Sequence, residues 1–189
     1  MSQQIKIRSS EDVVTFLKSQ HEQVKALFGQ VQATRGEDRQ QAFFELRRML
    51  AVHETAEEIV VHPKAAKNIT NGKAIVDERL AEEREAKKAL AELEKMDVDS
   101  PEFESAFTTL QTAVLAHAEA EESTEFSQLR AQMEAEELQE MERAAETAEK
   151  MAPTRPHPAA GESPAMNMMA GPFAMMLDRA RDAITRPGH

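Results

Sequence analysis

Residues 50–63, LAVHETAEEIVVHP, decide the fold, and residues 114–126, VLAHAEAEESTEF, repeat their pattern. In each stretch a histidine is followed four residues later by a glutamate, as His53 is by Glu57. Residues four apart lie on the same face of an α-helix. Apolar residues precede each histidine at steps of three and four, so the pattern predicts two helices whose buried faces carry these polar side chains.

Helix-forming residues surround both stretches, because glycine and proline are almost missing between residues 10 and 150. The few breakers divide this segment into four helices with predicted extents 11–34, 38–61, 73–96 and 101–128. Near-equal helices with short connections are typical of an antiparallel up-down-up-down four-helix bundle, which makes the predicted fold class all-α. A fifth helix, 131–149, has a narrow apolar stripe and is expected to pack outside the bundle. Ser10 with Asp12, and Ser100, are predicted N-terminal caps.

Three segments are predicted: a helical domain at 10–150, a proline-rich linker at 151–165 and an amphipathic tail at 166–189. The tail is expected to form a short C-terminal helix, whose apolar stripe consists of Phe173, Met176, Leu177, Ala180 and Ile184. We expect this helix to dock on its own bundle or on a second copy, which would give a homodimer through the tail.

The composition limits the partners and the chemistry. With 23 basic and 34 acidic residues the formal net charge is −11, which argues against nucleic acid and anionic membranes as partners. Cysteine is absent, so a metal site would use nitrogen and oxygen ligands. No apolar window approaches the length of a membrane span, and the first residues lack the apolar core of a signal peptide, so a cytoplasmic location is expected.

Polar residues interrupt the inward stripe of all four bundle helices. The first stripe contains His21, the second His53 and Glu57, the third Glu83, and the fourth His117 and Glu121. A single inward histidine is usually a hydrogen-bonded core residue, but six such residues together predict a metal site. Three imidazoles and three carboxylates suit iron, manganese or zinc, and two ions fit this ligand supply better than one, since a glutamate can bridge two cations.

Over about residues 11–130 the chain resembles the bacterial hemerythrin-like, or HHE cation-binding, family, through His21, H53-E-T-A-E57-E, E83-R-E-A-K and H117-A-E-A-E121-E. The resemblance implies two non-haem iron ions, oxo- or hydroxo-bridged, inside the bundle. Glu57 and Glu121 match its bridging carboxylates, and the three histidines match its terminal imidazoles. The family's third helix normally supplies a histidine where this chain has Glu82 and Glu83, which disfavours a reversible oxygen carrier and favours an oxidase, peroxide-handling or sensing role.

The neighbouring polar residues receive separate interpretations. His62 lies about 180° from His53 on a straight helix and precedes Pro63, so it is interpreted as a helix-end histidine or, if the last turn is loosened, as a further metal ligand. Glu58 and Glu122 are expected to be solvated or to contact ligands, and Glu54 and Glu119 to be surface charges.

Three functions remain open from the sequence. The first is a di-iron protein that binds oxygen, nitric oxide or peroxide for sensing, storage or detoxification. The second is a carboxylate-rich di-iron enzyme with peroxide-decomposing or oxidase activity. The third is a metal-free helical adaptor, which is disfavoured because six buried titratable groups without a cation would be costly. The sequence does not decide whether the protein is an enzyme.

Overall fold

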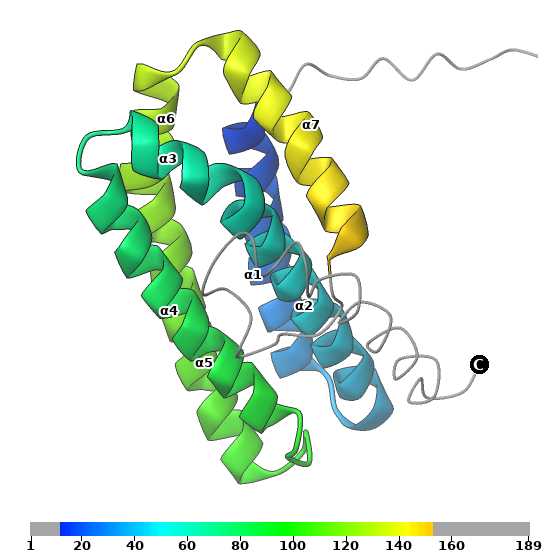
Figure 1. Cartoon of the computed structure of the whole chain (residues 1–189). Helices are drawn as coiled ribbons and strands as arrows, with labels where there is room; N and C mark the ends of the chain where they lie inside the picture. Colours follow the sequence, from blue (N-terminus) through cyan, green and yellow to red (C-terminus); the bar gives the residue numbers. More distant parts are fainter. Residues whose placement is uncertain (1–11, 153–189) are drawn as a thin grey trace, which may run out of the picture.

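A computed structural model describes residues 12–152, and Figure 1 shows that this part of the chain is a helical bundle. The seven α-helices of the described residues are α1 Val13–Ala33, α2 Gly36–Ala56, α3 His62–Asn68, α4 Gly72–Leu93, α5 Pro101–Ala120, α6 Phe126–Gln132 and α7 Ala135–Met151. Two π-turns, Glu57–Val61 and Glu121–Glu125, join α2 to α3 and α5 to α6 without a break in the helical path. The predicted all-α four-helix bundle is confirmed.

The ends of the long helices follow local chemistry. Asp12 caps α1 by accepting a hydrogen bond from the Thr15 amide, and Ser100 caps α5 by accepting one from the Phe103 amide. The second helical segment, however, does not end near residue 61. It continues to Asn68, because Pro63 lies in the first turn of α3, where a missing N–H costs little.

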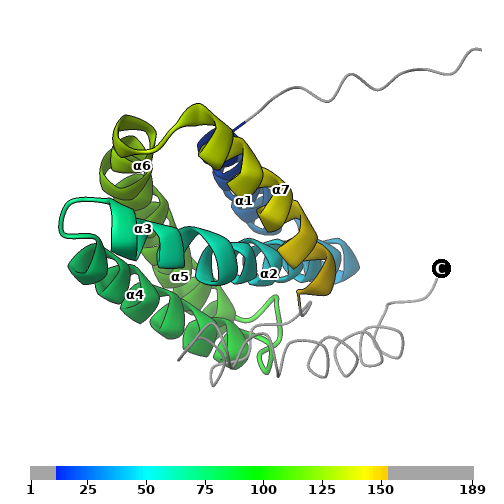
Figure 2. The same ribbon diagram turned by 45° about the horizontal axis from the view of Figure 1, so that its top comes forward.

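The helices pack as two pairs, α1 with α2 and α4 with α5, and α7 lies across the outside (Figures 1 and 2). The apolar stripe of α7 is buried against α1, α2 and the first π-turn, as predicted for a fifth helix outside the bundle. Its buried residues are Leu138, Met141, Ala145 and Ala148.

Two apolar clusters form the core, one at each end of the bundle. One contains Leu17, Val61 and Phe126, and the other contains Phe28 and Phe107. The inward histidines and glutamates of the four helices lie between these clusters, so packed side chains enclose them along the bundle axis.

The predicted linker and tail from residue 153 onward lie outside the described residues. Within 12–152, none of the helices is both long and apolar enough to cross a membrane.

Candidate metal centre

The two π-turns set the direction of the side chains at the centre. Each begins at the glutamate of an H-x-x-x-E pair, with the His62 amide donating to the Glu57 carbonyl and the Phe126 amide donating to the Glu121 carbonyl. A π-turn holds one residue more than an α-helical turn, and such turns are frequent at functional sites. The extra residue turns His62 back by about 100° towards the seam, which explains why this helix-end residue is buried.

The first group of candidate ligands is formed by His21 of α1, His53 of α2, and Glu57 and Glu121 at the starts of the two π-turns. The Nε2 atoms of His21 and His53 are 3.1 Å apart. Nε2 of His53 lies 3.3 Å from Oε2 of Glu57, and Nε2 of His21 lies 3.4 Å from Oε2 of Glu121. Two imidazole and two carboxylate groups therefore converge on one point.

The second group is formed by Glu57, Glu83, His117 and Glu121. Nε2 of His117 lies 3.1 Å from Oε1 of Glu121. In each group one ligand atom per residue lies within 4.8 Å of all the others. Glu57 and Glu121 belong to both groups. Their carboxylates are thus shared between His21 and His53 on one side and Glu83 and His117 on the other.

The carboxylates of Glu57 and Glu121 lie near the imidazoles but accept no hydrogen bond. Both side chains are fully buried, and all four of their oxygens lack a hydrogen-bond partner in the described part of the chain. A buried acceptor without a partner costs about 1–3 kcal/mol, and more when it is charged. Cations at the two groups would remove this cost, and the mixture of nitrogen and oxygen donors suits iron, manganese or zinc.

The surrounding charges shift the protonation of these groups in opposite directions. Burial, with the neighbouring Glu121 carboxylate, raises the pKa of Glu57 well above its usual value. Burial also acts to raise the pKa of Glu121, but the positive charge of His117 outweighs it and holds that pKa well below the usual value. Burial and the charge of His21 lower the pKa of His53 to about 3, so His53 is a neutral imidazole with a free lone pair.

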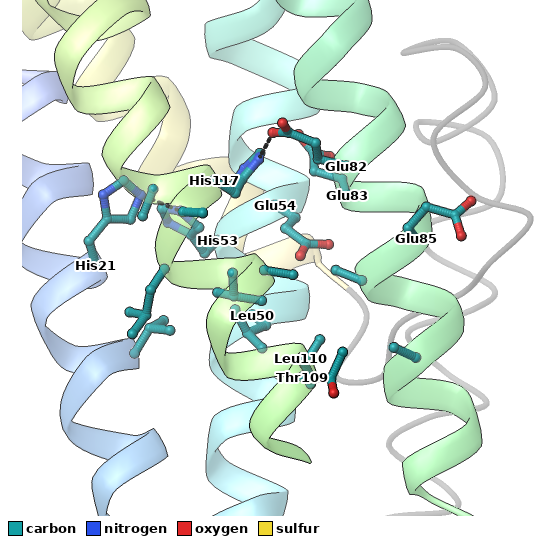
Figure 3. Close-up of a pocket in the computed structure, with 18 of the residues that line it drawn as sticks. His21, Leu50, His53, Glu54, Glu82, Glu83, Glu85, Thr109, Leu110 and His117 are labelled. Carbon is teal, nitrogen blue, oxygen red and sulfur yellow. Dashed lines mark hydrogen bonds and ion pairs between the residues drawn. The ribbon is translucent and has the colours of Figure 1, made fainter. Parts of the chain in front are cut away.

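A second layer of acceptors orients the three imidazoles. Nδ1 of His53 lies 2.7 Å from Oε1 of Gln20, and Nδ1 of His117 lies 2.8 Å from Oε2 of Glu82, the contact drawn in Figure 3. Nδ1 of His21 lies 2.9 Å from Oε1 of Glu122. With a proton on each Nδ1, the Nε2 lone pairs point to the centre, as is usual for metal-binding histidines.

The chain matches the family described as "Hemerythrin HHE cation binding domain" over residues 12–129. The protein belongs to this family. It is 29% identical over 171 residues to an uncharacterized hemerythrin-like protein of Schizosaccharomyces pombe, a match that covers 90% of this chain and 81% of the relative. The predicted resemblance is thereby confirmed.

Two further comparisons are with a solved structure and with a longer protein. A crystal structure of an HHE cation-binding domain protein from Mycobacterium kansasii aligns with a TM-score of 0.68 at 20% identity, over 89% of this chain and 99% of that one, which shows the fold. A DNA nickase of a Nostoc species is 26% identical over 125 residues, which cover 66% of this chain but only 35% of the nickase.

The HHE domain brings six of the seven predicted ligands into the two groups and places the seventh beside them. Nε2 of His62 lies 2.6 Å from Oε1 of Glu83, and its Nδ1 lies 3.0 Å from Oε1 of Glu125. Burial acts to lower the pKa of His62, but Glu83 and Glu125 outweigh it and raise that pKa well above its usual value. His62 is thus held between carboxylates and is in neither group.

Glu54 is the clear error of the sequence interpretation, which took it for a surface charge. It is 5% exposed, and its Oε2 lies 3.7 Å from the ammonium of Lys87, which also pairs with Glu58 and with Glu83. Burial raises the pKa of Glu54 to about 8, although Lys87 acts against this shift. The predicted exposure of Glu119 is correct.

Sequence reasoning also missed Gln20 and Glu125. Glu125 is fully buried and lies four residues after Glu121, so the spacing that revealed Glu121 also pointed to it. Gln20 had no comparable signal, because its partner His53 lies on another helix.

A cavity of about 750 Å³ opens between the two helix pairs and reaches the HHE centre. Figure 3 shows His21, His53 and His117 at one end of it, with Leu50 and Leu110 further along. A small ligand in this cavity would reach both groups of candidate ligands from the same side.

Proposed function

We propose that the centre holds two iron ions and that the protein binds oxygen or a related small ligand, nitric oxide or peroxide, for sensing, storage or detoxification. The observation that carries the proposal is the pair of fully buried carboxylates, Glu57 and Glu121, that belong to both ligand groups and whose oxygens lack hydrogen-bond partners within residues 12–152.

Each residue has a definite part in this proposal. His21 and His53 would be the terminal ligands of one ion, and His117 and Glu83 those of the other, with Glu57 and Glu121 shared. Gln20, Glu82 and Glu122 would hold the imidazoles in the binding orientation. Iron bound there would supply a redox-active cation for a small ligand that enters through the cavity.

The test is the iron content and optical spectrum of protein purified in air. We expect about two irons per chain, and a loss of at least one in His53→Ala and in His117→Ala. Glu119→Ala is the matched control, because this exposed carboxylate lies on the same helix as His117. Absence of transition metal after expression with ample iron would overturn the proposal, as would equal metal content in all three variants.

A second candidate, a peroxide-decomposing enzyme, is favoured by the asymmetry of the two groups. One offers two imidazoles and two carboxylates, whereas the other offers one imidazole and three carboxylates. Extra negative charge stabilises the more highly charged, oxidised cation. Conversion of two peroxide molecules to two waters and one dioxygen needs no other reductant, so dioxygen release on peroxide addition tests it. We expect Glu83→His to slow the release of dioxygen. If the wild-type protein releases no dioxygen, the enzyme is excluded and the binding role is the remaining proposal.

A further inference from the structure

The cavity beside the centre continues as an apolar groove between the α1/α2 pair and the α4/α5 pair. Its walls away from the histidines are formed by Leu50, Ala86, Ala89, Leu110, Ala113 and Val114. A concave, mostly apolar cavity with a few polar groups usually marks a binding site.

The charged residues that line this groove are all of one sign. Apart from the histidines, they are Glu54, Glu82, Glu83, Glu85 and Glu92. Glu85 and Glu92 are 73% and 64% exposed and lie along α4 at the rim. Lys88 and Lys95 pair with them but are not among the lining residues, and such exposed pairs are weak. The rim therefore favours an apolar partner with basic flanks.

The chain itself contains such a partner outside the described residues. In the sequence GPFAMMLDRARDAIT, residues 171–185, five apolar residues recur at helical spacing, beginning with Phe173. At about 100° per residue, Arg179 and Arg181 fall on opposite sides of that stripe. An apolar stripe with an arginine on either flank matches an apolar groove with an acidic rim.

The tail also has the necessary reach. Ala152, the last described residue, is buried at the end of α7, which packs on the α1/α2 wall of the groove. The 18 residues between Ala152 and residue 171 span up to about 56 Å when extended, against about 33 Å for the whole of α4. A tether of this length gives the tail an effective concentration at the groove in the millimolar range. The chain's own tail is therefore favoured over that of a second copy.

We propose that residues 171–186 dock as an amphipathic helix in this groove, with the stripe that begins at Phe173 facing Leu110 and Ala113 and the arginines facing the glutamates of α4.

A single tryptophan tests the docking, because the chain has no tryptophan or tyrosine. In full-length Phe173→Trp we expect the tryptophan emission maximum at a shorter wavelength than in the same protein unfolded by denaturant. His157→Trp, in the proline-rich stretch, should emit like a tryptophan in water. Adding Ala113→Arg should abolish the blue shift of Phe173→Trp. Ala113 is exposed in the described residues, so the arginine does not disrupt the core. Ala74→Arg, at an exposed position of α4 outside the groove, is the matched control.

A disulfide test then identifies the occupant, since the chain has no cysteine of its own. Ala113→Cys with Met176→Cys should give an oxidised monomer, and Ala74→Cys with Met176→Cys should not. A crosslinked dimer would overturn the proposal in favour of a second copy's tail. Emission of Phe173→Trp as in water, or a blue shift insensitive to Ala113→Arg, would also overturn it. None of these readouts depends on iron, so they stand apart from the test of the proposed function.

Discussion

Nε2 of His62 lies 2.6 Å from Oε1 of Glu83, and this pair occupies the place that His21 and Phe126 occupy in the other half of the centre. His62 and Phe126 each come directly after a π-turn. His21 stacks on Phe126, with ring centroids 5.7 Å apart and planes 13° from parallel. Where one half of the centre pairs a histidine with a phenylalanine, the other half thus pairs a glutamate with a histidine.

The first prediction is that His62 and Glu83 are energetically coupled. In metal-stripped protein, His62→Phe leaves the buried Glu83 without its closest partner and should lower the free energy of unfolding by about 3–5 kcal/mol. The double variant His62→Phe with Glu83→His restores the arrangement of His21 and Phe126 and should recover most of this loss. Urea unfolding of the two single variants and the double variant measures the coupling. Additive losses in the double variant would contradict it.

The second prediction concerns the stability of metal-stripped protein above pH 8. Burial acts to lower the pKa of His117, but Glu121 and Glu83 outweigh it and raise that pKa to about 10. The folded protein then keeps a proton that the unfolded chain, with a histidine pKa near 6.5, has lost. The stabilisation is complete below about pH 6.5 and disappears as the pH rises through 10, at up to about 1.4 kcal/mol per pH unit.

His117→Gln should therefore flatten the fall in unfolding free energy between pH 8.5 and 10. Glu54→Gln is the matched control. The pKa of Glu54 is raised only to about 8, so this carboxyl has lost its proton at the start of the window and should not change the slope. Equal slopes in wild type and His117→Gln would show that His117 is not the group that titrates.

The bundle and its inward polar seam were predictable because both follow from regular helical spacing. Steps of three and four residues placed His21, Glu83 and the two H-x-x-x-E pairs on buried faces, and the structure brings their atoms together. The spacing could not place His62, because a π-turn changes the rotation per residue and leaves no mark in the apolar pattern. It also could not place Glu54, whose burial depends on Lys87 of another helix.

The third prediction compares two glycines. Gly72 is buried at the start of α4, and a Cβ built there would overlap the carbonyl oxygen of Ala65. Gly72→Ala should therefore destabilise the fold by about 1–3 kcal/mol. Gly29 lies inside α1 with no neighbouring atom near its Cβ position, so Gly29→Ala should stabilise it by about 0.5–1 kcal/mol. Thermal unfolding measures both effects. If the melting temperature changes in the same direction in the two variants, the close contact between Gly72 and Ala65 is contradicted.

The last prediction is that the acceptors behind the imidazoles determine metal affinity without binding the metal. Gln20 and Glu82 fix the protons on Nδ1 of His53 and His117, at 2.7 and 2.8 Å. Gln20→Leu and Glu82→Leu free these rings to rotate and to change tautomer, so the affinity for iron should fall by about 10–100-fold in competition with a chelator. Gln23→Leu, at an exposed position of the same helix as Gln20, should leave the affinity unchanged. If Gln20→Leu and Gln23→Leu bind iron equally well, the orientation of His53 is set by the metal and its direct ligands alone.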